Sequence, residues 1–181
     1  ALTTLDVTCN QINDKWLEYL GDALKRNIAI ANLTLQNNVS SDVERIENLD
    51  LAWNNISDAG IEELAVALQY NTTILTLNLI GNKIASAGVQ HLANAFLQNR
   101  ILTTINISCS DIDETGAKYL AYVLQYNTTI STLILQYNRI GDEGVQHLAA
   151  ALLKNTVRST ICSFILFSFV SFNADTNYTQ S

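Results

Sequence analysis

The sequence predicts an α/β solenoid in which each repeat contributes one short strand and one helix. Three observations carry this prediction. Asparagine, or once serine, recurs at a step of mostly 28 residues, at Asn10, Asn38, Asn54, Asn82, Ser110 and Asn138. Each of these residues closes a segment of the form L-x-x-L-x-L-x-x-N, or a close variant of it. After it, the apolar residues change from alternation to helical spacing. A period of this length is typical of a solenoid, whose units bury their apolar faces only against their neighbours.

The segment before each asparagine is predicted to be the strand of its repeat. In the first repeat its apolar positions are Leu2, Leu5 and Val7, and the last repeat has Ile130, Leu133 and Leu135. Alternate residues of a strand point to opposite faces. The predicted solvent face therefore comprises Thr4, Asp6 and Thr8; Asn32, Thr34 and Gln36; Asn48, Asp50 and Ala52; Thr76, Asn78 and Ile80; Thr104, Asn106 and Ser108; and Thr132, Ile134 and Gln136.

The segment after each asparagine is predicted to be a helix. Behind Asn54 the apolar residues are Ile56, Ile61, Leu64, Ala65 and Leu68, and the same order returns behind Asn82 and Asn138. A short side chain with an oxygen atom can accept hydrogen bonds from the first free amides of a helix. The predicted caps are Asp58, Ser86, Glu114 and Asp142, and the predicted helix ends are Asn71, Asn99 and Asn155.

These segments resemble the leucine-rich repeats of the ribonuclease-inhibitor-like class. The resemblance covers roughly Ala1 to Thr156 and rests on six successive segments of the same form. It implies a right-handed βα solenoid shaped as a horseshoe arc, with a parallel sheet inside and helices on the convex side. Spacing predicts the curvature independently, because strands pair at about 4.8 Å whereas helices pack at about 8–10 Å.

The predicted solenoid spans residues 1–157 and has about six units. Its second unit keeps a strand at Leu33 and Leu35, but only residues 39–47 remain for the return to the next strand. The missing length corresponds to about three helical turns. Two interpretations remain open: a break in the convex wall that serves function, or a degenerate repeat or gene-model error. We favour the second.

Residues 158–181 depart from the repeat pattern. The chain is almost continuously apolar from Ile161 to Phe172 and polar from Asn173 to Ser181. The apolar run is shorter than the ~20 residues that a membrane helix needs, so we expect an edge strand and no membrane span. A membrane anchor, a true cap and an unrelated translated stretch remain alternatives.

We expect the chain to be a fragment of a longer array, because Leu2 already occupies the first repeat position and no polar cap precedes it. Uncapped strands at Leu2 to Val7 and Ile161 to Phe172 would present unpaired backbone groups. Such edges favour edge-to-edge pairing. The sequence therefore predicts self-association through the two ends.

Composition excludes some function classes. The net charge of −7 argues against nucleic acid, which proteins bind chiefly through Lys and Arg. The sequence contains no nucleophile motif, no phosphate-binding glycine loop and no metal-ligand spacing. His91 and His147 hold one equivalent helix position, which we expect to face solvent. We therefore expect neither an enzyme nor a cofactor.

Cysteines and glycosylation motifs give opposite indications of the compartment. We expect Cys9 and Cys109 to lie four strands, about 19 Å, apart, which is too far for a disulfide. This favours a cytoplasmic protein. Seven N-x-S/T motifs would instead indicate a secreted glycoprotein, so an extracellular location is not excluded. These motifs begin at Asn32, Asn38, Asn55, Asn71, Asn106, Asn127 and Asn177.

The function that this architecture implies is protein binding, as part of a scaffold or sensor. The predicted partner site lies on the concave sheet face, and its acidic residues favour a basic partner. Trp53 and Tyr137 are the expected anchors, since aromatic side chains concentrate binding energy. The alternatives are a small-GTPase regulator, an extracellular recognition protein, or a sheet face that binds nothing. The site residues are Asp6, Asp50, Trp53, Asn78, Asn106, Ile134 and Tyr137.

Overall fold

The computed structural model describes residues 4–10, 15, 17–22 and 47–155. The predictions made for residues 23–46, including Asn38, and for residues 158–181 lie outside this part of the chain. Residues 17–22 are helical. The strands are β1 (Thr4–Asp6), β2 (Asn48–Asp50), β3 (Thr76–Asn78), β4 (Thr104–Asn106) and β5 (Thr132–Ile134). The helices are α2 (Asp58–Tyr70), α3 (Ser86–Gln98), α4 (Glu114–Tyr126) and α5 (Gly141–Lys154).

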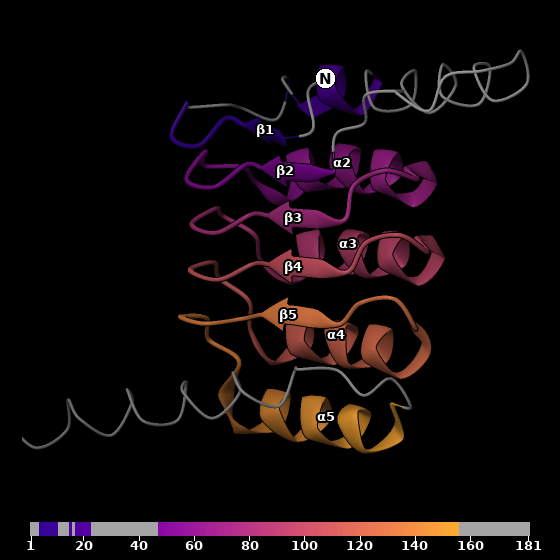
Figure 1. The fold of residues 1–181 in the computed structure, drawn as a ribbon. Coiled ribbons are helices and arrows are strands. Elements are labelled where there is room, and N and C mark those ends of the chain that lie inside the picture. The colour runs from indigo at the N-terminus through magenta and orange to yellow at the C-terminus, as the bar shows by residue number, and fades with distance from the viewer. Residues whose placement is uncertain (1–3, 11–14, 16, 23–46, 156–181) are drawn as a thin grey trace, which may run out of the picture.

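The five strands form one parallel sheet in the order β1-β2-β3-β4-β5. Figure 1 shows the strands stacked as one layer and the helices stacked as a second layer beside it. α2, α3 and α4 each follow a strand and return the chain to the next one, which is the arrangement of a βα solenoid. The predicted fold class is therefore confirmed.

One part of the predicted strand order is wrong. A strand at residues 32–36 was expected between the first strand and the Asn48 strand, but β1 pairs directly with β2, Thr4 opposite Asn48. Cys9 and Cys109 consequently follow strands that are three spacings apart, about 14 Å, rather than four. The distance still exceeds the reach of a disulfide, and both cysteines are free thiols.

The strands are also shorter than the alternation predicts. Each is three residues long, with its middle residue buried in β2, β3, β4 and β5. The predicted solvent face is wrong at Ala52 and Ser108, which are each 2 % exposed. They lie beyond the strand ends, where the backbone has already begun to turn.

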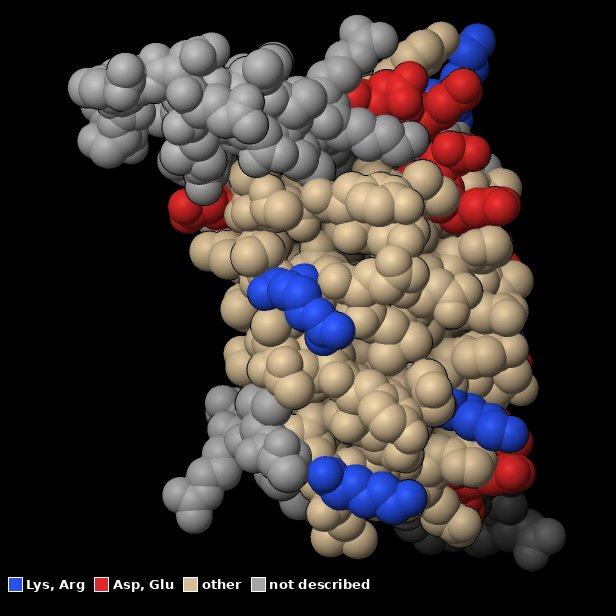
Figure 2. Space-filling view, turned by 90° about the vertical axis from the view of Figure 1, so that its right-hand side faces the viewer, with Lys and Arg blue, Asp and Glu red and all other residues tan. Residues whose placement is uncertain are grey.

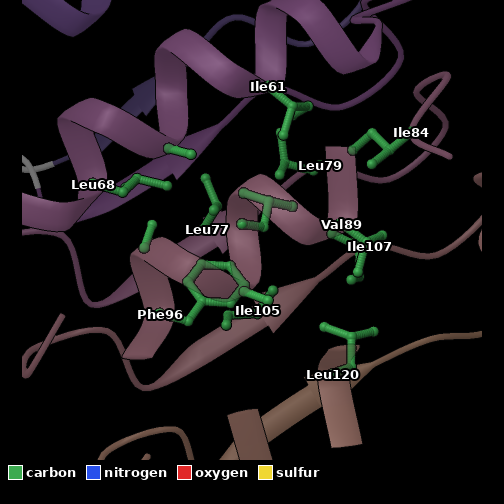
Figure 3. Close-up of a cluster of buried hydrophobic side chains, with 14 of the residues drawn as sticks. Ile61, Leu68, Leu77, Leu79, Ile84, Val89, Phe96, Ile105, Ile107 and Leu120 are labelled. Carbon is green, nitrogen blue, oxygen red and sulfur yellow. The ribbon is translucent and has the colours of Figure 1, made fainter. Parts of the chain in front are cut away.

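The core lies between the two layers. Each helix buries one stripe, as in α3 at Val89, Leu92 and Phe96, against the inward side chains of the strands. Figure 3 shows the Phe96 ring beside Leu77 of β3 and Ile105 of β4. Phe96 is 1 % exposed. Because Leu77 belongs to its own repeat and Ile105 to the next, the ring packs two adjacent repeats against each other.

Three helix starts differ from the prediction by one residue, and that of α5 differs by two, because its cap position is Ile140 rather than Asp142. Asp58, Ser86 and Glu114 are the first helical residues rather than the caps, and the residue before each takes the cap position. Asp58 instead accepts a hydrogen bond from Ala85 of the next repeat, with 2.8 Å between its Oδ1 and the amide nitrogen. The carboxylate therefore links repeats instead of closing its own helix.

Asp113 is the cap of α4, and its side chain accepts from the Gly116 amide at 3.0 Å. The Ser86 hydroxyl of the preceding repeat also donates to it. The hydroxyl and then the amide hold the pKa of Asp113 below its usual value, because both bonds favour the ionised form.

A second set of asparagines ends the helices on the same 28-residue step. It comprises Asn71, Asn99, Asn127 and Asn155, and we call it the helix-end ladder. Asn99 is typical: Oδ1 accepts from the amides of Ile101 and Leu102 at 2.9 and 2.8 Å. Its Nδ2 donates to the carbonyls of Leu68 and Asn71 at 2.7 and 3.1 Å, in the preceding repeat. One side chain thus ends its own helix and fastens it to the neighbour.

Candidate functional site

The open face of the sheet carries an aligned row of predicted site residues. The strand register places them opposite one another, one from each strand, in the order Asp6, Asp50, Asn78, Asn106, Ile134. We call this the central row. Asp50, Asn78, Asn106 and Ile134 are all partly exposed. The row is therefore continuous from β2 to β5.

Hydrogen bonds hold the middle of the central row. Asp50 Oδ2 accepts from Asn78 Nδ2 at 2.9 Å, and Asp50 Oδ1 accepts from the Ala52 amide at 3.0 Å. Asn78 and Asn106 each accept from the amide two residues later, at 3.2 and 3.1 Å. Because these bonds fix their rotamers, the polar floor is rigid before any partner arrives. Ile134 has no polar group and leaves the β5 end of the row apolar.

A second row lies just beyond the strand ends and forms the rim of the sheet. Its members are Cys9, Trp53, Gly81, Cys109 and Tyr137, one per repeat. All five have positive φ, from 52° to 70°, in the left-handed region that L residues rarely adopt. Each of the first four donates its amide hydrogen to a carbonyl of the next repeat, as Trp53 does to Ile80 at 2.8 Å. The turns of these four repeats are thus each held by the next repeat.

Trp53 and Tyr137, the two predicted anchors, stand on this rim in different surroundings. Trp53 is 52 % exposed, and the six-membered ring of its indole lies over Gly81. Tyr137 is 75 % exposed. They follow β2 and β5, three strand spacings apart, which is about 14 Å. Trp53 is therefore the better packed of the two aromatics.

Directly behind the rim lies the strand-end ladder, the predicted row of Asn10, Asn54, Asn82, Ser110 and Asn138 in the described residues. Asn82 Oδ1 accepts from the amides of Asn54 and Ile56 at 3.2 and 3.0 Å. Its Nδ2 donates to the carbonyls of Leu51 and Leu79 at 3.0 and 2.8 Å. Asn10 is joined to Asn54 without an intermediate rung, by a 2.9 Å bond from its amide to Asn54 Oδ1. The ladder supports the turns that carry the rim.

Ser110 is a weak rung. Among the described residues its side chain makes one bond, to the Ser108 carbonyl at 3.5 Å. The asparagine at the same position two repeats earlier, Asn54, donates to three carbonyls. The hydroxyl is too short to reach the amides of the preceding turn, which an asparagine bonds at the other rungs.

Ser110→Asn is therefore expected to stabilise the array by about 1 kcal/mol, because the amide would supply the missing bonds to backbone groups. Chemical denaturation measures this as a higher midpoint with an unchanged slope. Thr128→Asn, at an exposed position, serves as the control and should leave the midpoint where it is. A midpoint lowered by Ser110→Asn would mean that the site has no room for the amide.

The two edges of the solenoid differ in charge. Beyond the rim, Asp111 pairs with Arg139 of the next repeat at 3.2 Å, and Lys83 is exposed in the repeat before. Both paired side chains are more than half exposed, so the pair contributes little stability. Figure 2 shows the opposite edge, where the helices end, as a face with few charged side chains. Exposed Tyr70 and Tyr126 lie at the helix ends there.

The described ranges were also searched for metal-binding groups and for membrane-spanning helices. No group of three His, Cys, Asp or Glu side chains there could hold a metal ion. Of the helices in these ranges, none has the length and apolar character to cross a membrane.

Comparison with known proteins gives a family and a fold. A family model described as "Leucine Rich repeat" matches residues 2–20, 46–65, 70–93, 98–121 and 126–149, which together are more than half of the chain. No curated protein matches. Among solved structures, the leiomodin-1 actin-binding site 2 superimposes with a TM-score of 0.64 at 23% identity, covering 84% of this chain and 80% of that one.

A second similar structure is the tropomodulin C-terminal domain from Caenorhabditis elegans. It has a TM-score of 0.62 and 13% identity, and the match covers 85% of this chain and 84% of the other. At these identities the likeness shows a shared fold. It does not transfer residues or ligands.

Proposed function

This chain belongs to the leucine-rich repeat family, and we propose that it binds a protein partner on its concave sheet face as part of a scaffold or sensor. The observation that carries the proposal is Trp53: a large aromatic side chain, 52 % exposed, standing on the rim of a rigid polar floor. Binding energy at protein interfaces concentrates in a few such side chains, and fixed polar neighbours supply complementarity. The central row and Tyr137 extend the proposed site across five strands.

The proposed partner is basic where it meets the N-terminal half of the site. Asp50 lies three residues before Trp53 in the same repeat, and its partly exposed carboxylate is oriented by Asn78 and the Ala52 amide. An attraction of this kind acts mostly on the association rate and weakens with salt. A small-GTPase regulator remains an alternative without a residue in its favour. Catalysis is not part of the proposal.

Trp53→Ala is expected to weaken partner binding by about 2 kcal/mol or more, roughly 30-fold, because it removes the largest exposed side chain of the site. The measurement uses a partner captured on the parent array, with the affinity then determined for each variant. Tyr70→Ala is the matched control: an aromatic of similar exposure, 60 %, in the same repeat but on the opposite edge. Glu63→Ala tests the convex face in the same way.

A larger loss of affinity from Tyr70→Ala or Glu63→Ala than from Trp53→Ala would place the site away from the sheet and refute the proposal.

Filamentous actin is the first candidate partner to test directly, since the leiomodin-1 domain of similar fold is described as an actin-binding site. Co-sedimentation of the parent and Trp53→Ala chains with actin tests that partner. Equal co-sedimentation of both variants would exclude Trp53 from an actin site.

We propose that the protein is cytoplasmic. Two of the seven glycosylation motifs support this, because Asn71 and Asn127 are 2 % and 3 % exposed. The atom that would carry a glycan, Nδ2, is bonded at Asn127 to the Phe96 and Asn99 carbonyls. Neither residue could be modified in this fold. Glycans found by mass spectrometry at exposed Asn55 would favour the extracellular alternative, and glycans at Asn71 or Asn127 would contradict the described packing.

A further inference from the structure

The rim contains one glycine, and backbone conformation does not explain it. Gly81 has a φ of 70°, where glycine is the usual residue. However, Cys9, Trp53, Cys109 and Tyr137 occupy the same position in the other repeats with φ between 52° and 57°. Four of five rim turns therefore accept a side chain in this conformation. Another cause must account for the missing side chain at Gly81.

That cause is the indole of Trp53. A Cβ built on Gly81 would lie 2.2, 2.4 and 2.6 Å from Cε3, Cδ2 and Cζ3 of Trp53, closer than real Cβ contacts come. These are three successive atoms of the six-membered ring, and their nearly equal distances place the ring face, rather than its edge, over the glycine. The indole thus occupies the volume that a side chain at residue 81 would need.

The backbone keeps the two residues together. The Trp53 amide donates to the carbonyl of Ile80 at 2.8 Å, and the Gly81 amide donates to the carbonyl of Ser108 at 3.0 Å. The ladder behind them adds the bond from the Asn54 amide to Asn82 Oδ1. The turn that carries Trp53 is therefore fixed against the turn that carries Gly81, and the ring has one flat surface on which to rest.

We propose that Gly81 is the positioning residue of the binding site: it seats Trp53 with one ring face on the protein and leaves the rest of the ring, 52 % of the side chain, for the partner. This inference rests on the proposed function for its role in binding. An aromatic anchor held in one orientation loses less freedom on binding than a free one.

Gly81→Ala tests whether Gly81 positions the indole of Trp53. The new Cβ must displace the indole, and the unfolding midpoint should fall by roughly 5 °C. The alanine also adds backbone strain at positive φ, so the same substitution is made in a Trp53→Ala background, where the strain persists but the overlap is gone. There the midpoint should fall by no more than about 2 °C. The difference between the two backgrounds measures the contact itself.

Fluorine NMR of the chain labelled with 5-fluorotryptophan gives a direct readout. The chain has two tryptophans, so it yields two signals, and the one absent from Trp53→Ala belongs to Trp53. Gly81→Ala should shift that signal and leave the other unchanged. It should also weaken binding of the captured partner by about tenfold or more, although every contacting side chain is retained.

If Gly81→Ala lowered the unfolding midpoint equally in the parent and in Trp53→Ala, and left the Trp53 signal unshifted, Gly81 would not position the indole. Unchanged partner affinity in Gly81→Ala, alongside a loss in Trp53→Ala, would overturn its role in binding. If instead Trp53→Ala binds the partner normally, but the midpoint losses of Gly81→Ala still differ between the two backgrounds, the proposed function fails. The positioning of Trp53 by Gly81 is then still supported. The two ideas are therefore separable by experiment.

Discussion

Replacing Phe96 with alanine should lower the free energy of unfolding by about 3–5 kcal/mol. The side chain is 1 % exposed and lies in the middle repeat, beside Leu77 and Ile105 (Figure 3). Truncation removes apolar contacts and leaves a cavity that neighbouring repeats can fill only in part. Because a solenoid is stabilised by contacts between adjacent units, a defect at this point weakens the joints on both sides. Thermal and urea unfolding measure the loss.

Phe96→Leu is the matched control. Leucine occupies the equivalent helix position in the other repeats, at Leu68, Leu124 and Leu152. A change that keeps most of the volume usually costs less than about 1.5 kcal/mol. Leu153→Ala, at a side chain 90 % exposed, should have almost no effect. If Phe96→Ala unfolded at the same midpoint as Phe96→Leu, the packing described for the ring would be incorrect.

Asn99→Ala should cost about 2–4 kcal/mol, the second largest expected loss. Its side chain bonds two amides of its own turn and two carbonyls of the preceding repeat, at 2.7–3.1 Å. Each buried backbone group left without a partner costs about 1–3 kcal/mol, and water relieves part of this because the turn lies at an edge. Denaturation at equilibrium, compared with the parent, gives the value.

The control is the same substitution on the same helix. Asn94 of α3 is exposed, and Asn94→Ala should change stability by less than about 0.5 kcal/mol, in the stabilising direction because alanine favours helices. Asn82→Ala, in the strand-end ladder, removes four comparable bonds and should cost about 1–3 kcal/mol. Parent-like stability of both ladder variants would show that the ladders do not hold the repeats together.

Much of the architecture was predictable because the same repeat pattern recurs several times along the sequence. Leu49, Leu77, Ile105 and Leu133 recur at the same step and are all buried at the middle of their strands. The same repetition predicts the helix ends. It also predicts that Asp50, Asn78, Asn106 and Ile134 align, since equal steps place equivalent residues in register. The prediction did not include the hydrogen bonds of the helix-end ladder, although its asparagines repeat on the 28-residue step.

The strand order in the first half of the chain could not be predicted in this way, because residues 32–36 and 48–52 both have the strand pattern. A pattern identifies a strand but not its neighbour. Backbone bonds between β1 and β2, 44 residues apart, decide that the second of these segments pairs with the first strand. The helix caps were displaced for a related reason. Asp58 and Ser86 bond groups of the following repeat, and a local rule for the start of a helix does not include such groups.

By itself, the sequence determined the period, the strand–helix unit, the buried stripe and most residues of the open face, because each depends on local spacing repeated at a constant step. Only the tertiary structure decided the rim. Cysteine and tryptophan are not typical turn residues, yet Cys9, Trp53 and Cys109 adopt the left-handed conformation where their amides bond to the adjacent repeat. The contact of Trp53 with Gly81 joins residues 28 positions apart. Such a contact exists only after two repeats have stacked, so no pattern within one repeat contains it.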